Sequence, residues 1–351
     1  MLDRKVFIRA FSTLGEHLKS VSDCFLLDAM KKTEAQNPFF TIYMQQKALK
    51  VIAENYLTEE ALSKLLRFSE GPLDDRDFFN RRMERKRVGI IMAGNIPAVG
   101  FHDLLSVLST GAKARVKVSS KDGGITRAIV QMLEKISPEI SSAITFEDRR
   151  FLFEYQGRLD YLLFSGSDAN RSLLKDEFPG VPMLSRGSRF SLGVLSGKET
   201  DEELELLAED MFLYCGLGCR SISYLFVPKG YDMGRIIRAS TSMAGHLTQI
   251  EPYMSNVVRQ RALDTLEGVP FLDGGFFLLE PSDSPFPQIG CVRYSEYEDI
   301  SEVDSFCSRY CDQIQKKYTN FGIAQSPATD DWMDGINTVT SILEGCLADA
   351  V

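Results

Sequence analysis

The sequence predicts an α/β protein in which a helical N-terminal segment precedes a region built on a parallel sheet. Residues 1–80 carry apolar side chains at helical spacing, and from Arg87 onward the pattern changes to strand, turn and helix in repeated order. The expected strands are uninterrupted apolar runs, which are typical of a parallel sheet that helices cover on both faces. Further along the chain, the mixture of strands and helices up to about residue 318 indicates a second α/β lobe.

The N-terminal helices are predicted from an amphipathic pattern. Apolar residues at positions 6, 7, 10, 11 and 14 fall on one face of a helix. The segment Gln36-Asn37-Pro38 interrupts this pattern, and residues 41–56 carry a second apolar stripe. Thr58 precedes two glutamates and is expected to cap a third helix. Such helices are expected to pack against the larger sheet.

The first sheet is predicted from three apolar runs and the helical segments between them. The expected strands are 88–93, 114–119 and 160–164, and the expected helices are 103–110, 126–136 and one from Asp168 onward. In parallel sheets of this kind, ligands gather at the carboxyl ends of the strands. A polar or glycine-containing turn follows each expected strand: Gly94-Asn95, Ser119-Ser120 and Ser165-Gly166-Ser167.

A cysteine lies in a glycine-lined turn of the second lobe. An acidic helix is expected from Thr200 to about Tyr214 and a strand over 223–227, with Tyr-Cys-Gly-Leu-Gly-Cys-Arg-Ser at 214–221 in between. Glycines on both sides of Leu217 let a substrate approach the backbone. Arg220 would favour the thiolate of Cys219, which makes Cys219 a candidate nucleophile. The alternative is a buried structural cysteine, and Cys215 is expected to be one.

Composition restricts the classes of protein that the chain can represent. Its 351 residues suffice for two domains, and a net charge of −9 argues against a nucleic-acid-binding protein. Seven cysteines without framework spacing favour a reducing compartment. The pairs Cys215–Cys219 and Cys307–Cys311 lack the two-residue spacing of common zinc sites, so no metal is expected. The N-terminus does not resemble a signal peptide, and the uncharged run 88–101 is too short to span a bilayer, so a cytoplasmic protein is expected.

Taken in order, these pieces resemble the aldehyde dehydrogenase superfamily. Within it, they resemble the fatty acyl-CoA reductase family of bacterial bioluminescence (LuxC-type), from about residue 35 to the C-terminus. The motifs that carry the resemblance are MAGNIPAVGFHD at 92–103, VKVSSKD at 116–122, YCGLGCRS at 214–221 and FGIAQSPATDDWMDGINT at 321–338. The resemblance implies an aldehyde dehydrogenase-like fold, with a Rossmann-type cofactor domain and a second α/β catalytic domain.

The resemblance also implies a division of the chain. Residues 1–80 would be a helical segment that packs on the core, and residues 81–200 a dinucleotide-binding domain. Residues 201–325 would form the catalytic domain with the cysteine, and residues 326–351 a segment that returns to the core.

Two catalytic residues follow from the resemblance. Cys219 would attack a carbonyl and carry the acyl group, and the side chain of Asn95 with the Cys219 N–H would hold the developing oxyanion. A turn-forming asparagine is the alternative for Asn95. His102 could act as an acid or base, although a histidine at the start of a helix is more often structural.

The cofactor residues implied by the resemblance lie at two strand ends. Lys117 would bind the adenosine ribose, and the loop Ser119-Ser120-Lys121 lacks the glutamate found in NAD-specific relatives, which favours NADP(H). The turn Ser165-Gly166-Ser167 would meet the pyrophosphate at a helix N-terminus. The later glycine of this loop in the superfamily falls near Arg171 here, which puts the pyrophosphate pose in doubt.

A departure from the superfamily bears on the reaction. Hydrolytic members carry a glutamate base before a paired-glycine turn, whereas residues 184–189, Leu-Ser-Arg-Gly-Ser-Arg, contain no carboxylate. Attack of water on a thioester should then be slow, and another thiol such as coenzyme A would give or accept the acyl group. Arg186 and Arg189 could meet phosphates, or they could be surface arginines.

The sequence therefore predicts an acyl-CoA reductase that reduces a long-chain acyl thioester to an aldehyde with NADPH. The acyl donor would be acyl-CoA or an acyl-carrier thioester, and family members also have an acyl-protein synthetase as partner. Superfamily members are dimers or tetramers, which implies a homo-oligomer. Two alternatives stay open: a short-chain acylating aldehyde dehydrogenase, and a non-catalytic acyl-carrying scaffold subunit.

Overall fold

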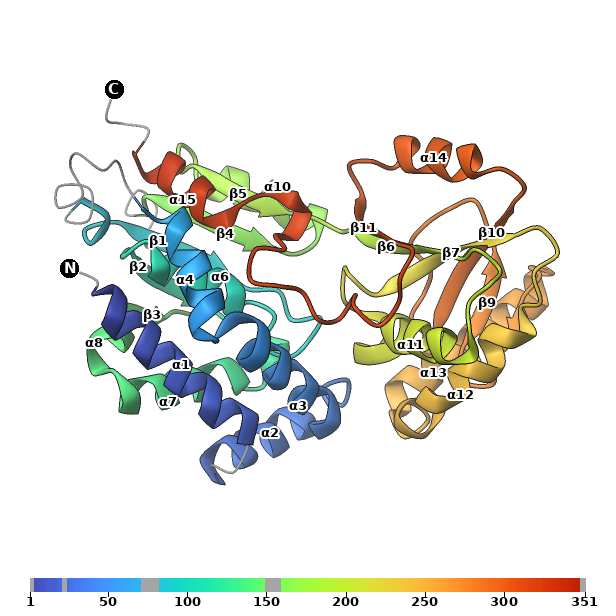
Figure 1. Cartoon of the computed structure of the whole chain (residues 1–351), viewed down its shortest axis with the longest axis horizontal. Coiled ribbons are helices and arrows are strands. Elements are labelled where there is room, and N and C mark those ends of the chain that lie inside the picture. The colour runs from blue at the N-terminus through green and yellow to red at the C-terminus, as the bar shows by residue number, and fades with distance from the viewer. Residues whose placement is uncertain (1–2, 21–23, 71–81, 149–158, 348–351) are drawn as a thin grey trace. The chain divides into compact units, whose positions relative to one another are not determined.

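The computed structural model describes residues 3–20, 24–70, 82–148 and 159–347 (Figure 1). Its contacts divide the chain into two compact units. Unit 1 comprises Met1–Gly187 and Pro327–Val351, and unit 2 comprises Ser188–Ser326. Each unit is built on a sheet of its own.

The sheet of unit 1 has five parallel strands in the order β3-β2-β1-β4-β5. Its strands are β1 (Arg87–Ile91), β2 (Lys113–Lys117), β3 (Ile144–Phe146), β4 (Tyr161–Ser165) and β5 (Met183–Arg186). The predicted strands at 88, 114 and 160 are confirmed within a few residues at their ends. The strand order places β1 in the middle, with β2 on one side and β4 on the other.

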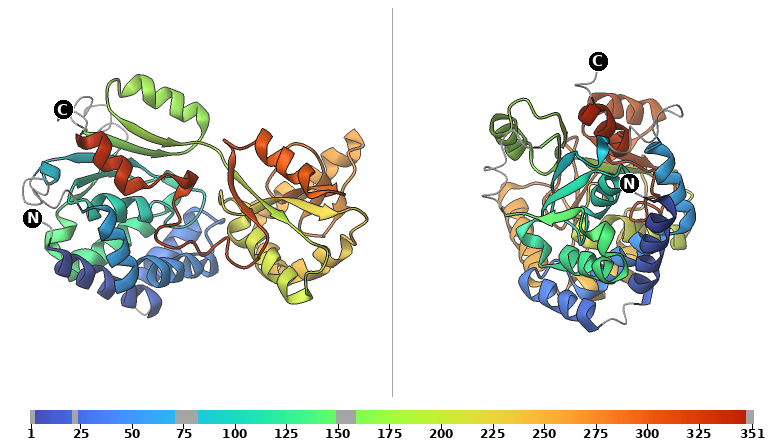
Figure 2. Two further views of the ribbon diagram at one scale, coloured as in Figure 1. Left: turned by 45° about the horizontal axis from the view of Figure 1, so that its top comes forward. Right: turned by 90° about the vertical axis from the view of Figure 1, so that its left-hand side faces the viewer.

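Helices cover both faces of this sheet. On one face lie α6 (Phe101–Ser109), α7 (Ile125–Ile136) and the short α8 (Pro138–Ser141), which share a core with side chains of β1 and β2. On the other face α10 (Asp168–Glu177) packs its Leu174 against Leu162 and Phe164. Figure 2 shows α10 and the N-terminal helices on opposite sides of the strands.

The N-terminal helices form an outer layer over α6 and α7. They are α1 (Arg4–Ser20), α2 (Cys24–Gln36), α3 (Ile42–Val51), the π-helical turn η1 (Ile52–Tyr56) and α4 (Glu59–Phe68). Thr58 caps α4 by accepting the N–H of Ala61, as predicted, and Thr41 caps α3 in the same way. Side chains of α1 that the amphipathic pattern marked, such as Phe7 and Leu14, are fully buried in the core of unit 1.

The C-terminal segment also belongs to unit 1. It contains the short turn η5 (Met333–Gly335) and α15 (Thr338–Leu347), which packs on α6, β4 and β5. The hydroxyls of Tyr161 and Ser341 lie 2.6 Å apart, and a Cβ at Gly345 would lie 2.1 Å from the Tyr161 ring. Glycine is therefore required where α15 crosses β4.

A buried ion pair joins β5, α6 and α15. Nη1 of Arg186, at the end of β5, donates to both carboxylate oxygens of Asp103 at 2.9 and 2.8 Å. Nη2 of Arg186 donates to Oγ1 of Thr338, the first residue of α15, at 2.7 Å. The side chains of Arg186 and Asp103 are only 3% and 4% exposed, so each charge depends on the other for compensation.

The sheet of unit 2 has six strands in the order β11-β6-β7-β10-β9-β8. They are β6 (Phe190–Val194), β7 (Ile222–Pro228), β8 (Leu272–Asp273), β9 (Leu278–Pro281), β10 (Cys291–Tyr297) and β11 (Ile314–Tyr318). All neighbours are parallel except β8, which pairs antiparallel with β9 at the edge. β6 belongs to unit 2 because it lies between β7 and β11.

Helices cover both faces of the second sheet as well (Figure 1). On one face lie α11 (Asp201–Phe212), α12 (Gly234–Leu247) and α13 (Glu251–Glu267), and on the other lies α14 (Ile300–Arg309). Thr200 and Glu203 form a capping box at the start of α11. Phe306 of α14 packs on Tyr224 and Phe226 of β7, with ring centroids 4.7 and 5.1 Å apart.

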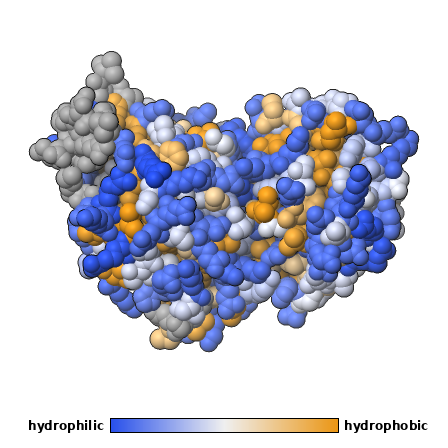
Figure 3. Space-filling model, in the orientation of Figure 1, coloured by the Kyte–Doolittle hydropathy of each residue, from blue (hydrophilic) through white to orange (hydrophobic). Residues whose placement is uncertain are grey.

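Apolar residues are interspersed with hydrophilic ones on the face drawn in Figure 3. Among the helices of the described ranges, none has both the length and the apolar character that a bilayer crossing requires.

Breaking the buried ion pair is expected to destabilise unit 1 strongly. Asp103→Ala leaves the Arg186 guanidinium buried without a countercharge and should lower the free energy of unfolding by about 3–5 kcal/mol. The double variant Asp103→Leu with Arg186→Met replaces the pair with apolar groups and should lie within about 2 kcal/mol of the wild type. Urea denaturation measures both values, and a double variant as unstable as Asp103→Ala would contradict the assignment.

Candidate active site

The carboxyl edge of the first sheet brings together the loops that the sequence marked. The connections through α6 and α7 run along one face of the sheet, whereas the connection from β4 to β5 through α10 runs along the other. β1 and β4 are therefore neighbours whose helices lie on opposite faces of the sheet, and ligands of such sheets bind beyond the carboxyl ends of the strands at a point of this kind. Asn95 follows β1, Lys117 ends β2 and Ser165 ends β4.

The loops after β1 and β2 are in close contact. The N–H of Met92 donates to the carbonyl of Lys117 at 3.0 Å. A Cβ at Gly94 would lie 2.1 Å from Oγ of Ser119, so only glycine fits there. The loop that carries Asn95 is thus held against the loop predicted to bind the ribose.

The backbone of the Asn95 loop is strained. Ala98 has φ +53°, a left-handed conformation that is uncommon for residues with a Cβ. A Cβ at Gly100 would lie 2.3 Å from Cγ of Met92, so the loop returns tightly onto the end of β1. Asn95 itself is half-buried.

The loop after β2 exposes its cationic and hydroxyl side chains. Ser120 and Lys121 are exposed on the short turn η3 (Ser120–Asp122), and Lys117 is half-buried. Oγ of Ser119 accepts the N–H of Lys121 at 3.2 Å, and Nδ2 of Asn37 donates to the carbonyl of Lys121 at 3.0 Å. The N-terminal helical layer thereby fixes this loop.

Asp122, a carboxylate that the sequence analysis did not single out, caps helix α7 after this loop. Asp122 accepts the backbone N–H and the hydroxyl of Thr126 at 3.2 and 2.6 Å, at the start of α7. Burial raises the pKa of Asp122, and its hydrogen bonds with Thr126 oppose this effect. The N-terminus of α7 is therefore occupied by the protein itself, and the Asp-Gly-Gly sequence at 122–124 was the signal for it.

The turn after β4 is only partly disposed to bind an anion. The N–H of Gly166 donates to the carbonyl of Arg186 at 3.1 Å, so this amide is engaged within the sheet. Ser167 caps α10 by accepting the N–H of Asn170 at 3.4 Å. Arg171 lies in the first turn of α10, where a cation is unfavourable unless an anion is near.

For Arg186 and His102 the sequence left both a functional and a structural role open, and in the structure both side chains make structural contacts. Arg186 is buried against Asp103, so it is neither a surface arginine nor a phosphate ligand. Nε2 of His102 lies 2.8 Å from the carbonyl of Thr329, and its ring contacts Tyr56 and Trp332. His102 thus ties α6 to the C-terminal segment and to η1.

Cys219 lies at the amino end of β7, in a turn between α11 and that strand. The N–H of Ser221 closes the turn on the carbonyl of Gly218 at 3.0 Å. Oγ of Ser191, from β6, donates to the carbonyl of Cys219 at 2.8 Å. The side chain of Cys219 is partly exposed, and that of Arg220, the next residue in the chain, is 8% exposed.

The backbone before Cys219 is left-handed over three residues. Tyr214, Cys215 and Gly216 have φ of +60°, +58° and +70°. For residues with a Cβ this conformation costs about 1–2 kcal/mol each, and such strain gathers at functional sites. Neither Tyr214 nor Cys215 carries a sequence signal for it.

A buried carboxylate on α11 holds the loop beside this turn. Asp210 is 1% exposed and accepts the N–H groups of Gly322 and Ala324 at 2.6 and 3.0 Å. Burial raises the pKa of Asp210 to about 6, although these N–H groups favour the carboxylate.

Gln325, which follows this loop, reaches the cysteine turn directly. Its Nε2 donates to the carbonyl of Asp210 at 3.0 Å and to Oγ of Ser221 at 3.1 Å. The turn is therefore held by Ser191 before Cys219 in the chain and by Gln325 after it. The sequence motif at 321–338 contained Gln325, but its contact with Ser221 could not be read from the sequence.

The two cysteines of the turn differ in environment. Cys215 is 2% exposed, and burial raises the pKa of its thiol to about 12, so it packs as a neutral side chain, as expected. Within the described ranges, no three His, Cys, Asp or Glu side chains lie close enough to hold a metal ion.

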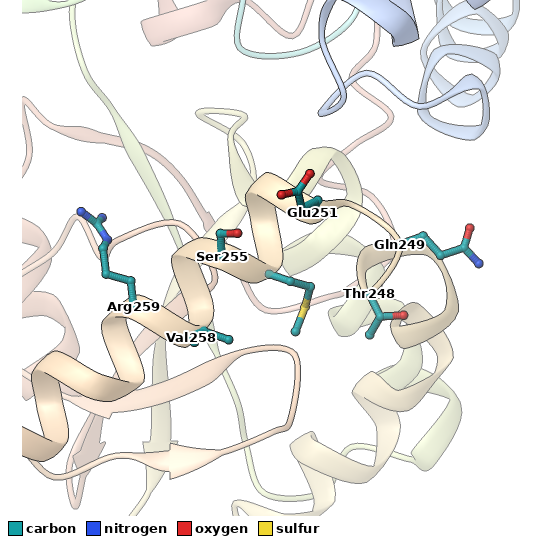
Figure 4. Close-up of a pocket in the computed structure, with 7 residues that line it drawn as sticks. Thr248, Gln249, Glu251, Ser255, Val258 and Arg259 are labelled. Carbon is teal, nitrogen blue, oxygen red and sulfur yellow. The ribbon is translucent and has the colours of Figure 1, made fainter.

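A shallow depression on unit 2 lies apart from these residues (Figure 4). Glu251, Ser255, Val258 and Arg259 of α13 line it, together with Thr248 and Gln249 from the preceding turn. None of the candidate site residues contributes to it.

Solved structures share the fold of this chain. No family model matches the chain, and no curated protein matches it in sequence. The chain is similar to an oxidoreductase from Marinobacter aquaeolei, with a TM-score of 0.64 and 12% identity over 91% of this chain and 74% of that one. It is similar to an NADP-dependent glyceraldehyde-3-phosphate dehydrogenase from Bacillus halodurans complexed with NADP, with a TM-score of 0.60 and 15% identity over 91% and 74%.

A third similar structure is aldehyde dehydrogenase 21 from Physcomitrella patens, with a TM-score of 0.61 and 13% identity over 96% of this chain and 84% of that one. At these identities the likeness establishes the fold alone. The chain has an aldehyde dehydrogenase-like α/β fold, with a parallel sheet in unit 1 and a mixed sheet in unit 2, and the predicted fold class is confirmed.

The left-handed conformation of Cys215 leads to a prediction about the stability of variants at this position. Cys215→Gly and Cys215→Ala both remove the thiol, but only alanine keeps a Cβ at φ +58°. We expect Cys215→Gly to be the more stable variant by about 1 kcal/mol in urea denaturation. The control is Ala239→Gly in helix α12, which should lose about 1 kcal/mol. If alanine were more stable than glycine at both positions, the left-handed conformation of Cys215 would be contradicted.

The raised pKa of Asp210 leads to a prediction about how the free energy of unfolding depends on pH. Its pKa is about 6 in the folded protein and near 3.9 in an unfolded chain, so its stabilising contribution is complete below pH 4 and lost as pH rises through 6. Relative to Asp210→Asn, the wild type should therefore lose about 2 kcal/mol of stability between pH 4 and pH 7. Urea denaturation at several pH values measures this difference, and a difference that stays constant with pH would contradict the assignment.

Proposed function

We propose that the chain is an aldehyde-group oxidoreductase that reduces an acyl thioester to an aldehyde with NADPH, by way of an acyl group on Cys219. The observation that carries this proposal is the turn around Cys219. In an aldehyde dehydrogenase-like fold, a partly exposed thiol lies on a strained turn that two side chains hold in place.

The turn suits a nucleophile. A thiol that attacks a carbonyl must be reachable and fixed in position, because misplacement of the attacking atom by about 1 Å costs about a hundredfold in rate. Ser191 and Gln325 fix the backbone around Cys219, and Arg220, its neighbour in the chain, would favour the thiolate. Cys219 is therefore assigned as the residue that forms the thioester.

The oxyanion of the tetrahedral intermediate needs donors that are fixed in advance. We assign this role to the side-chain amide of Asn95 and the backbone N–H of Cys219. The contact between Gly94 and Ser119 and the strain at Ala98 hold the Asn95 loop in one conformation. A fixed donor of this kind contributes about 3–4 kcal/mol to stabilisation of the transition state.

The surroundings of Arg186 support a thiol, rather than water, as acyl donor and acceptor. Residues 184–189 contain no carboxylate, and the carboxylate that this segment contacts, that of Asp103, accepts hydrogen bonds from Arg186 with both oxygens. An engaged, buried carboxylate is a poor general base toward water. The thioester would therefore exchange with coenzyme A or another carrier thiol.

The carboxyl edge of the first sheet fits a nicotinamide dinucleotide. Lys117, Ser119, Ser120 and Lys121 lie at the end of β2, and Ser165, Gly166 and Ser167 at the end of β4, the strands on either side of β1. When bound, NADPH supplies the hydride that reduces the acyl group. Asp122 is engaged with Thr126, so the exposed loop presents hydroxyls and Lys121, which favours a 2′-phosphate.

One observation favours the acyl-carrying scaffold as a second candidate. The N–H of Gly166 is bonded to Arg186, which removes a donor that a pyrophosphate would use. A scaffold subunit would accept an acyl group on Cys219 from an acyl-protein synthetase or a carrier and would not reduce it. Both candidates leave a short-chain substrate open, because chain length depends on the shape of the substrate tunnel.

The proposal is tested by intact-protein mass spectrometry after mixing with palmitoyl-CoA or acetyl-CoA and then with NADPH. Wild type should gain one acyl mass and lose it on addition of NADPH, with release of aldehyde. Cys219→Ala should acylate at least about 10³-fold more slowly. Asn95→Ala should slow acylation about 10²–10³-fold without loss of stability.

Cys311→Ala is the matched control, because Cys311 is an exposed cysteine of unit 2 that lies far along the chain from the turn. It should acylate like the wild type. An adduct on wild type that persists with NADPH would support the scaffold, and an adduct that survives in Cys219→Ala would overturn both candidates.

A further inference from the structure

Helix α13 carries a row of exposed apolar side chains. Val258, Ala262 and Leu266 follow one another at four-residue spacing, so they form one row along the helix, and all three are exposed. Leu266 is 84% exposed, more than any other large apolar side chain in the described part of the chain, and Val258 is 56% exposed. Exposed apolar side chains that gather in this way are typical of a protein interaction site.

The shallow depression at the start of α13 gives this row a shape. Its volume is about 530 Å³, and Met254, Ser255 and Val258 form its α13 side (Figure 4). A cavity of about 150 Å³ holds a benzene ring, so the depression has room for a leucine side chain. Leu266 lies eight residues after Val258, which is about 12 Å along the helix. The helix therefore carries an apolar projection near one end and a partly apolar depression near the other.

The neighbouring row of α13 is charged at both ends. It consists of Arg259, Leu263 and Glu267, all exposed, with a cation at one end and an anion at the other. Nη2 of Arg259 donates to Oδ1 of Asn256 on its own helix at 3.3 Å. A partner of a single charge sign would meet a like charge at one end of this row. The same row turned end for end would instead place opposite charges together at both ends.

A second copy of α13, antiparallel to the first, satisfies both rows at once. Pairing of Val258 with Leu266 of the second copy centres on Ala262, and pairing of Arg259 with Glu267 of the second copy centres on Leu263. The two centres differ by one residue, about 1.5 Å along the helix, so one arrangement serves both pairings. The small side chain of Ala262 lies where the two helices would be closest.

We propose that α13 forms an antiparallel, two-fold interface with α13 of a second copy of this chain, in which Leu266 of each copy enters the depression beside Val258 of the other. A two-fold interface uses the same patch on both subunits, and this patch complements itself in shape and in charge. The interface does not depend on the function proposed above. One helix pair buries less than the roughly 1,200 Å² of a standard interface, so we expect a reversible dimer with Kd of about 10–100 μM.

The apolar contact is tested by sedimentation velocity of the full chain over a range of concentrations. A reducing agent keeps the exposed Cys24 and Cys311 from forming disulfides between copies. Leu266→Ser removes two contacts per dimer and should weaken association at least about thirtyfold. The matched control is Ile300→Ser, because Ile300 is 52% exposed at the start of α14 on the other face of the sheet. This control should associate like the wild type.

The charge pairing is tested by two reversals, Arg259→Glu and Glu267→Arg. Each variant alone places like charges together twice and should weaken self-association about tenfold at low ionic strength. Mixing the two variants restores both opposite pairs. Native mass spectrometry of the mixture should therefore show mixed dimers well above the statistical half. The double variant should associate within about threefold of the wild type. Urea denaturation of each variant confirms that the monomer is folded.

The proposal would be overturned by any of three results. The first is a wild type that stays monomeric at concentrations up to about 1 mM, as expected if α13 meets a different protein or only solvent. The second is association that Leu266→Ser leaves unchanged, which would place the interface elsewhere. The third is a mixture of the two charge variants that forms mixed dimers no more often than chance, which would exclude the antiparallel pairing.

Discussion

A parallel sheet must be covered on both faces, and this requirement organises both units. In unit 1 it explains why β1 has α6 on one side and why the chain returns through α10 on the other. The change of side between β1 and β4 leaves their carboxyl ends uncovered by crossing loops. The Asn95 loop and the Ser165 turn are at this edge as a consequence of the strand order.

The loops that carry Asn95 and Cys219 both contain strained backbone, and this strain requires that both loops be held rigidly. Ala98 lies in the loop that carries Asn95, and Tyr214 and Cys215 precede Cys219, all with positive φ. Side chains elsewhere must hold these conformations, because a free chain would relax them. Gln325 does so for the cysteine turn, through a loop that the buried Asp210 carboxylate anchors. The stability of α11 and the position of Cys219 are therefore linked.

Much of the fold could be predicted from the sequence because its signals are local. Apolar runs and caps such as Thr58 depend on neighbours a few residues away, and the structure has them where expected. Arg186 shows the opposite case. A charged residue near glycine and serine reads as exposed, and it is buried only because Asp103, 83 residues away in the chain, compensates its charge. The left-handed backbone of Cys215 has the same origin, since no property of cysteine favours it.

The Arg186–Asp103 pair links fold and chemistry in the proposed reaction. Both oxygens of the Asp103 carboxylate accept hydrogen bonds from the buried Arg186 guanidinium, so this carboxylate is engaged in a structural contact. The pair also holds Thr338 and approaches Oγ of Ser165 at 3.4 Å, so it supports the β4 turn assigned to the cofactor. Loss of the pair would thus affect stability and the β4 turn together. Loss of Asp103 would not create a hydrolytic enzyme, because residues 184–189 contain no carboxylate that could activate water.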